Sequence, residues 1–268
     1  MTKIMFIIIG VLLVTGAGVA AVLLQQGAAQ SGMTGNNAAM LGNGNTASVV
    51  SADVDYFDGT KGFLAYPASG SPEAGVVMIH EWWGLNDNIK NMAKMLAGEG
   101  YAVLAVDLYH GEVAADSTRA QQLSSSLNQE EANRNLSAAA QYLRENRNVS
   151  KVISLGWCFG GGQSLQMALS GEKLDGTIIY YGRLTSDTDQ LSKITWPVLG
   201  IFGGADQSIP VSEVEGFRNA LNTLGITNEI VIYPGVGHAF ANPSGASYAP
   251  NETKDAWAKT LAFLKENA

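Results

Sequence analysis

The stretch Ser154–Gly162, Ser-Leu-Gly-Trp-Cys-Phe-Gly-Gly-Gly, follows an apolar β-branched run and holds the only cysteine of this 268-residue chain, Cys158. Glycines stand two positions before and two positions after it. A chain that turns sharply from a strand into a helix needs such nearly side-chain-free positions. The helix then points its N-terminal N–H groups at the thiol, which favours a thiolate or an oxyanion. The pattern predicts a nucleophilic cysteine; a buried structural cysteine is the alternative, because free cysteine is often buried.

The segments around this stretch alternate between two patterns. Apolar runs predict strands over 75–80, 101–106, 152–156, 177–181, 197–202 and 229–233, and an early edge hairpin spans 56–66. Helical patterns cover roughly 87–98, 117–146, 160–170, 211–224 and 251–267. Continuous apolar strands separated by helices predict an α/β fold with a mostly parallel sheet covered on both faces. The ligand site of such a sheet lies beyond the C-terminal ends of its strands.

Charge and composition exclude several classes of function. The formal net charge is −8 and the sequence shows no basic patch, so we expect no nucleic-acid partner. One cysteine excludes an internal disulfide framework and a cysteine-rich metal site. The three histidines (His80, His110 and His238) lack the spacing of metal ligands. We expect neither a metal nor an organic cofactor.

The N-terminus differs from the rest of the chain. Ile4–Leu24 is almost uninterruptedly apolar, long enough to cross a bilayer as a helix, and one basic residue precedes it. We therefore expect residues 1–25 to be a transmembrane anchor with the rest exported; a cleaved signal sequence and secretion are the alternative. Residues 26–50 have the composition of a flexible tether, and residues 51–268 are expected to form the catalytic domain outside the cytoplasm.

Two more candidate catalytic residues follow the last two predicted strands. Asp206 comes after the strand over 197–202, and His238 comes after the strand over 229–233 in a glycine-rich loop. The order nucleophile, acid, histidine suits a triad in which the imidazole takes the thiol proton and the acid orients the imidazole. The alternatives are a turn-forming aspartate and a histidine that only bonds its own loop.

The stretch His80–Asp87, His-Glu-Trp-Trp-Gly-Leu-Asn-Asp, begins at the end of the predicted strand over 75–80. Its carboxylate, Glu81, is expected near the nucleophile because it lies at the same edge of the sheet. A surface glutamate without a role is the alternative. Trp83 belongs either to the pocket or to simple packing.

Five ordered motifs together resemble the dienelactone hydrolase (carboxymethylenebutenolidase) family, which has the α/β-hydrolase fold. They are Gly156–Gly161, His80–Gly84, Asp107–Tyr109, Asp206–Pro210 and Gly237–Phe240. The resemblance covers roughly residues 54–266.

The resemblance implies roles for particular residues. It implies a triad of Cys158, His238 and Asp206, and an oxyanion hole made by the backbone N–H groups of Phe159 and Trp82. It also implies that Glu81 holds the thiol in check and helps to ionise it when substrate binds.

The chain departs from the best-known members of that family at two arginine positions that bind the substrate carboxylate. Gly111 and Asn242 stand there, so the guanidinium groups that recognise carboxylates are missing. His110 and Arg183 are the nearby single candidates for a cation. The aromatic side chains expected at the pocket mouth are uncharged: Trp82, Trp83, Tyr109 and Phe240.

The sequence as a whole predicts an exported hydrolase that cleaves a small-molecule ester or lactone through a thioester on Cys158, with a monomer favoured. A general carboxylesterase is the alternative within the same class. A non-hydrolytic binding or thiol-redox protein on the same fold is the alternative from another class.

Overall fold

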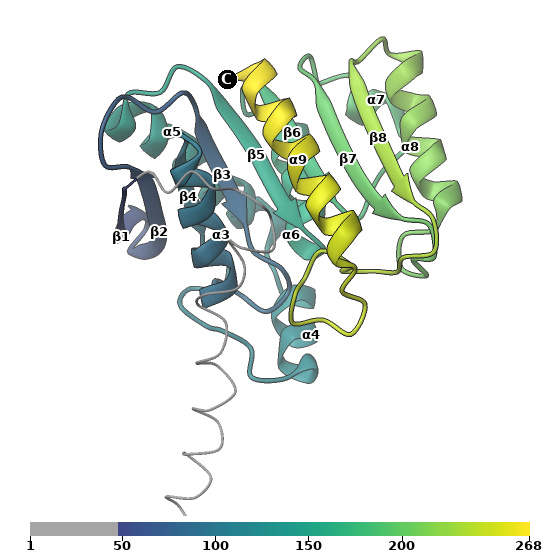
Figure 1. The fold of residues 1–268 in the computed structure, drawn as a ribbon, viewed down its shortest axis with the longest axis horizontal. Coiled ribbons are helices and arrows are strands. Elements are labelled where there is room, and N and C mark those ends of the chain that lie inside the picture. Colours follow the sequence, from purple (N-terminus) through teal and green to yellow (C-terminus); the bar gives the residue numbers. More distant parts are fainter. Residues whose placement is uncertain (1–47) are drawn as a thin grey trace, which may run out of the picture. The chain divides into compact units, whose positions relative to one another are not determined.

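The central sheet of the computed structural model, which describes residues 48–268, has the strand order β1-β2-β4-β3-β5-β6-β7-β8 (Figure 1). The strands are β1 (Val49–Phe57), β2 (Thr60–Pro67), β3 (Gly75–Ile79), β4 (Ala102–Val106), β5 (Val152–Trp157), β6 (Gly176–Tyr180), β7 (Val198–Gly203) and β8 (Asn228–Tyr233). The helices are α3 (Asp87–Gly98), α4 (Ser117–Ser125), α5 (Gln129–Arg147), α6 (Phe159–Leu169), α7 (Thr188–Leu191), α8 (Val211–Thr223) and α9 (Pro250–Asn267). Strands β3 to β8 run parallel, and the β1–β2 hairpin joins β4 antiparallel. The predicted mostly parallel α/β sheet is confirmed.

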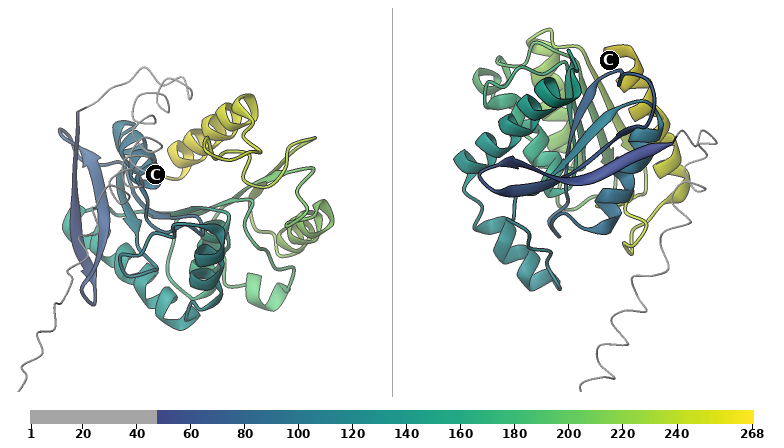
Figure 2. Two further views of the ribbon diagram at one scale, coloured as in Figure 1. Left: turned by 90° about the horizontal axis from the view of Figure 1, so that it is seen from below. Right: turned by 90° about the vertical axis from the view of Figure 1, so that its left-hand side faces the viewer.

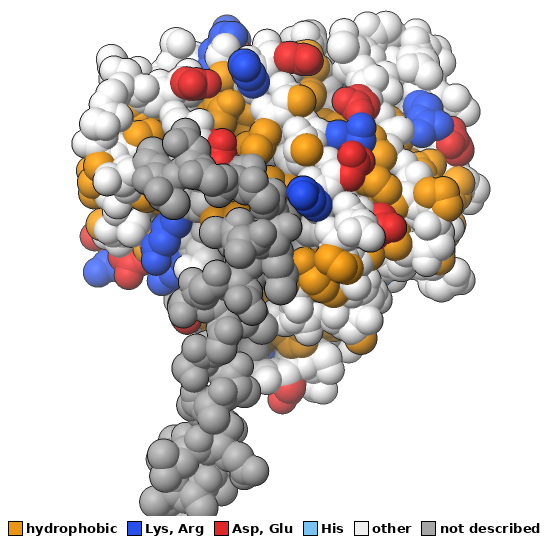
Figure 3. Space-filling model, in the orientation of Figure 1, with side chains coloured by type: hydrophobic (Ala, Val, Ile, Leu, Met, Phe, Trp, Pro, Cys, Tyr) orange, Lys and Arg blue, Asp and Glu red, His pale blue; other side chains and the backbone are white. Residues whose placement is uncertain are grey.

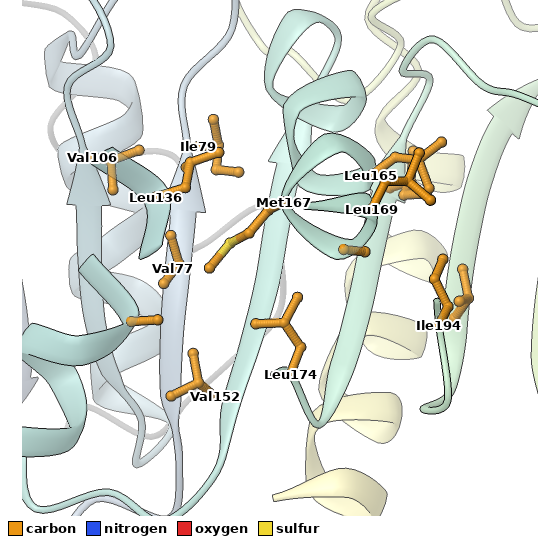
Figure 4. Close-up of a cluster of buried hydrophobic side chains, with 14 of the residues drawn as sticks. Val77, Ile79, Val106, Leu136, Val152, Leu165, Met167, Leu169, Leu174 and Ile194 are labelled. Atoms are coloured by element: carbon orange, nitrogen blue, oxygen red, sulfur yellow. The ribbon is translucent and has the colours of Figure 1, made fainter. Parts of the chain in front are cut away.

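The sheet is covered on both faces because successive residues of a strand point to opposite sides. In β3, Val76 and Met78 belong to the apolar cluster formed with α3 and α9, whereas Val77 and Ile79 belong to the cluster formed with α5, α6 and α8. Figure 2 shows the two helical layers from a second direction. Figure 4 shows part of the second cluster, in which Val77 and Ile79 lie near Leu136 and Met167.

One predicted helix is divided in two. The pattern over 117–146 forms α4 and α5, which are separated at Ser126–Asn128. The hydroxyls of Ser124 and Ser125 donate to carbonyls three or four residues earlier, and Asn128 caps the next helix by accepting from the backbone N–H of Glu131 (3.1 Å). Side chains that hydrogen-bond to their own backbone compete with the hydrogen bonds of a continuing helix. The helical spacing of apolar residues therefore continues through Ser126–Asn128, although the helix is interrupted there.

The hairpin forms at the expected edge of the sheet but starts earlier than expected. Strand β1 begins at Val49, inside the stretch assigned to the tether, and Val49 pairs with Pro67. Asp58 and Gly59 form the connection, both with positive φ (41° and 75°). The predicted anchor and most of the tether lie outside the described residues. Among residues 48–268, no helix has both the length and the apolar character needed to cross a membrane.

Charges of both signs are interspersed on the face of the molecule shown in Figure 3. Lys259 of α9 pairs with Glu229 of β8 (3.5 Å), and Lys90 of α3 pairs with Asp53 of β1 (3.3 Å). Such partly exposed pairs contribute little to stability, each about 0–1 kcal/mol. The two apolar clusters therefore hold the sheet and helices together.

Candidate active site

Cys158 lies between the end of β5 and the start of α6. Its backbone conformation (φ 54°, ψ −116°) is uncommon for a residue with a side chain. Its N–H donates to the carbonyl of Tyr180 (2.9 Å). The glycines on either side are needed for close packing. A Cβ on Gly160 would overlap the carbonyl oxygens of Ile79 and His80, and a Cβ on Gly156 would overlap the carbonyl of Gly160. The turn is therefore held by its surroundings, as backbone strain at a functional site generally is.

His238 connects the thiol to a buried carboxylate. Its Nε2 lies 3.1 Å from Sγ of Cys158, and its Nδ1 lies 2.8 Å from Oδ2 of Asp206. The other oxygen of Asp206 accepts the backbone N–H groups of Ser208 (2.7 Å) and Ile209 (3.1 Å). The carboxylate is thus held by its own turn while it faces the imidazole. The structure brings together all three residues of the predicted triad.

Two loops meet to place that histidine opposite that aspartate. The N–H of Gly204 donates to the carbonyl of Tyr233 (2.7 Å), and the N–H of Ala205 donates to the carbonyl of Val236 (2.9 Å). A Cβ on Gly203 would lie 2.5 Å from the carbonyl oxygen of Val236, so only glycine allows this approach. Adjacent parallel strands β7 and β8 therefore deliver the acid and the base to one edge of the sheet.

The surroundings of the thiol oppose its ionisation. Burial, followed by the negative charge of Glu81, raises the pKa of Cys158 to about 12, and the charge of Asp206 adds to this. The backbone N–H groups of Phe159 and Trp82 hydrogen-bond the sulfur and pull the pKa in the other direction. The two predicted oxyanion donors therefore converge on the sulfur of Cys158. The same two N–H groups can stabilise the negatively charged carbonyl oxygen of a substrate bound beside the sulfur.

The carboxyl of Glu81 is buried, with 5% of the residue exposed. Burial raises the pKa of Glu81 to about 7. The side-chain amide of Asn242 donates a hydrogen bond to Oε2 of Glu81 (2.6 Å), which lowers the pKa in part. Glu81 is therefore beside the thiol, as expected, and is poised to hold or release a proton near neutral pH.

The predicted aromatic pocket residues divide into two groups. Trp82 and Trp83 are partly exposed and meet edge to face, with ring centroids 5.2 Å apart. Tyr109 is buried against His80 (4.7 Å) and Phe159 (5.5 Å). Trp82 and Trp83 follow Glu81 in the chain, and Tyr109 contacts Phe159, which follows Cys158.

The expectation that Phe240 lies at the pocket mouth is wrong. Its side chain is fully buried and packs edge to face against Tyr181 and Tyr233, with ring centroids 5.5 and 5.4 Å away. Ala239 has a positive φ of 58°, and the carbonyl of Phe240 accepts from Ala249 and Thr253 near the start of α9. Phe240 therefore anchors the histidine loop to the core.

Sequence reasoning did not find a role for His80 or Tyr181. His80 is fully buried; its Nε2 accepts from the N–H of Leu108 (3.2 Å), so Nδ1 carries the proton and donates to the carbonyl of Glu81 (2.5 Å). Burial lowers the pKa of His80, which keeps the ring neutral. Tyr181 packs edge to face on His238, with ring centroids 5.4 Å apart. No sequence signal marked the contact of His80 with Leu108 or that of Tyr181 with His238, and both join residues far apart in the chain.

The two single candidates for a substrate-binding cation lie in different surroundings. His110 is exposed and its Nε2 lies 3.1 Å from Glu131. Arg183 is exposed in the loop after β6. Within residues 48–268, no group of three or more His, Cys, Asp or Glu side chains is arranged to hold a metal ion.

Comparisons with known proteins agree on one family. The sequence model of the dienelactone hydrolase family matches residues 60–268. A presumed carboxymethylenebutenolidase of Saccharolobus solfataricus is 33% identical over 249 residues, covering 78% of this chain and 95% of that protein. The crystal structure of a presumed dienelactone hydrolase from Klebsiella pneumoniae is 27% identical, with a TM-score of 0.74 over 81% of this chain and 99% of that chain.

Proposed function

Because the chain belongs to the dienelactone hydrolase family, we propose that it cleaves an ester or lactone through a thioester intermediate on Cys158. Membership of this family makes it a hydrolase acting on carboxylic ester or lactone bonds. One observation carries the proposal of a cysteine nucleophile. Nε2 of His238 lies 3.1 Å from the sulfur while Nδ1 is held 2.8 Å from the buried Asp206.

In the first half of the reaction, Sγ of Cys158 attacks the carbonyl carbon of the substrate. The thiol proton passes to Nε2 of His238, and Asp206 stabilises the imidazolium that results. The carbonyl oxygen becomes an oxyanion and accepts the N–H groups of Phe159 and Trp82. When this intermediate collapses, the carbon–oxygen bond to the leaving group breaks and His238 returns its proton to that oxygen. An ester releases an alcohol, whereas a lactone opens into a tethered hydroxyl.

In the second half, a water molecule hydrolyses the thioester. Nε2 of His238 takes a proton from the water as its oxygen attacks the thioester carbon. The carbon–sulfur bond then breaks, the proton returns to the sulfur of Cys158, and the acid product leaves. The two halves are balanced without a metal, an oxidant or a reductant.

Glu81 is proposed to control the charge beside the thiol. Its ionised form raises the pKa of Cys158, so a protonated Glu81 makes the thiolate easier to form. The resemblance implies this kind of restraint, and burial of the carboxyl supports it.

The substrate is proposed to be uncharged near the reacting carbonyl. Gly111 and Asn242 occupy the positions where the resemblance places arginines, and the amide of Asn242 is engaged with Glu81. Partly exposed Trp82 and Trp83 supply an aromatic surface beside the proposed oxyanion hole. Pockets with such linings favour apolar ligands.

We also propose that the chain is exported and that its first 25 residues anchor it to the membrane. The apolar run over 4–24 and the lack of basic residues just after it support this placement. The catalytic domain would then act on the outer side of the membrane.

Ester hydrolysis by the purified protein tests the proposal. Nitrophenyl acetate should give a burst of nitrophenol equal to the enzyme concentration if deacylation is slower than acylation. Trapping the acyl group on Cys158, identified by peptide mass, would establish the thioester. Binding of esters and lactones without any cleavage in this assay would favour the non-hydrolytic alternative.

A further inference from the structure

The side chain of Asn242, in the loop after β8, contacts Glu81, in the loop after β3, 161 positions earlier in the chain. Its Nδ2 donates to Oε2 of Glu81 (2.6 Å), and its Oδ1 accepts the backbone N–H of Ser244 (2.9 Å). The backbone N–H of Asn242 also donates to the carbonyl of Ala239 (3.0 Å). With the oxygen committed to its own loop, the NH₂ group has to face Glu81. The orientation of the amide is therefore set by the fold.

Glu81 faces titratable groups from several elements. The thiol of Cys158 lies at the start of α6 and the phenol of Tyr181 follows β6, and each interacts electrostatically with Glu81. The same thiol is contacted by His238 (3.1 Å) and is acted on by the charge of Asp206. The neighbouring ring of His80 is neutral and donates only to the backbone carbonyl of Glu81.

The described part of the chain places no lysine or arginine against this carboxyl. Burial and the hydrogen bond from Asn242 are the causes that determine its pKa. A neutral amide can donate to a carboxylate and also to the carbonyl oxygen of a protonated carboxyl group. A cation at the same place would hold Glu81 in its ionised form.

We propose that Asn242 is a positioning residue that holds Glu81 beside the Cys158 thiol in both protonation states, so that the proton on Glu81 sets the charge that the thiol meets. This inference rests on the proposed function in taking Cys158 as the nucleophile. With Glu81 protonated, the thiol passes its proton to Nε2 of His238 without placing a thiolate beside an ionised Glu81. With Glu81 ionised, the same transfer is opposed.

Alkylation of the full-length protein by iodoacetamide measures this coupling directly. The chain has one cysteine, so the rate reports on Cys158 alone. The rate should rise with pH, with a shoulder where Glu81 ionises, because the new negative charge opposes thiolate formation. The variant Glu81→Gln should lose that shoulder and thereby identify it.

The Asn242 variants then separate positioning from simple packing. Asn242→Leu keeps a similar volume without a donor, and it should move the shoulder to higher pH by about one unit, because the charged carboxylate has lost a hydrogen bond. Asn242→Asp should move it further in the same direction, because a second carboxylate disfavours ionisation. Asn242→Gln should restore most of the wild-type profile. Asn228→Leu is the matched control at the opposite end of β8, where the amide bonds Asn222 and the carbonyl of Ile226.

The inference is overturned if Asn242→Leu and Asn242→Asp keep the wild-type shoulder, or if Asn228→Leu moves it equally. Melting temperatures check that each variant is folded, and Asn242→Asp decides the question if the leucine variant is not. Alkylation needs no substrate. A shifted shoulder in a protein that hydrolyses no ester therefore supports the role of Asn242 while the proposed function fails.

Discussion

Nδ1 of His238 lies 2.8 Å from Oδ2 of Asp206, whose other oxygen is fully occupied by two backbone N–H groups of its own turn. The position of the acid is therefore set by its own turn and does not depend on the imidazole alone. This relationship determines which tautomer presents a free Nε2 to the thiol.

Removing members of this unit should cost unequal amounts of activity. Cys158→Ala should abolish ester turnover, and His238→Ala should reduce kcat by at least about 10³-fold, since members of a catalytic unit act together. Asp206→Asn should cost less, because Asp206 orients the imidazole and stabilises its charged form but does not itself exchange a proton with the substrate. Steady-state kinetics measure this, with Asp58→Asn in the hairpin turn as the matched control. Substantial activity in Cys158→Ala would refute the assignment of the nucleophile.

The stability of the protein should depend on pH through Glu81. Its pKa is raised from 4.5 to about 7 in the folded chain, so the stability that it contributes is fully present below pH 4.5 and is lost as pH rises through 7. Relative to Glu81→Gln, the free energy of unfolding of the wild type should fall by up to about 3 kcal/mol over that interval. Denaturant unfolding at several pH values measures it. Parallel curves for the two proteins would show that the carboxyl ionises normally.

Glycines of the strand–helix turn should differ in their tolerance of a methyl group. Gly160→Ala should destabilise the protein by about 3 kcal/mol or more, since its Cβ would overlap two carbonyl oxygens of the β3 end. Gly162→Ala is the matched control on the same helix, where the added Cβ meets Arg183 at ordinary contact distance (3.4 Å). It should be neutral or stabilising by up to about 1 kcal/mol. Thermal unfolding of both variants decides the point, and equal effects would contradict the close approach.

Cell fractionation tests the proposed anchor. The full-length chain should be found in the membrane fraction, with the catalytic domain open to protease added outside the cytoplasmic membrane. Deletion of residues 1–47 should leave a soluble, active enzyme, because β1 and the rest of the sheet lie within residues 48–268. Deletion of residues 1–57 is the contrasting variant, because it also removes β1, the strand that pairs antiparallel with β2. A full-length protein found in the cytosol would refute the anchor.

Neutral substrates should be preferred over anionic ones. A charge-assisted hydrogen bond contributes about 1.5–3 kcal/mol, so two absent arginines should weaken carboxylate recognition at least about tenfold. We expect a higher kcat/KM for neutral aryl or short-chain esters and lactones than for a carboxylate-bearing dienelactone. Side-by-side kinetics test this. A clear preference for the anionic lactone would direct attention to Arg183, and Arg183→Gln would then test that residue.

Much of the fold and of the triad was predictable from the sequence. The β-branched runs predicted six of the strands, and the glycines around Cys158 predicted the turn between β5 and α6. These features depend on residues that are close in the chain, where steric limits and hydrophobic period act directly. Once the strands were predicted parallel, Asp206 and His238 had to reach the same edge of the sheet.

Other features were decided by packing between distant segments. The sequence alone did not predict that Asn242 donates to Glu81, because the contact depends on the loops after β3 and β8 meeting across the sheet edge. Phe240 adjoins the histidine in sequence, yet the core beside Tyr181 and Tyr233 takes its ring away from the surface. Local sequence determined where the chain turns, which residues cap helices and which strand residues face each side of the sheet. Only the tertiary structure decided which buried polar groups meet, because desolvation and hydrogen bonding depend on neighbours brought together from across the chain.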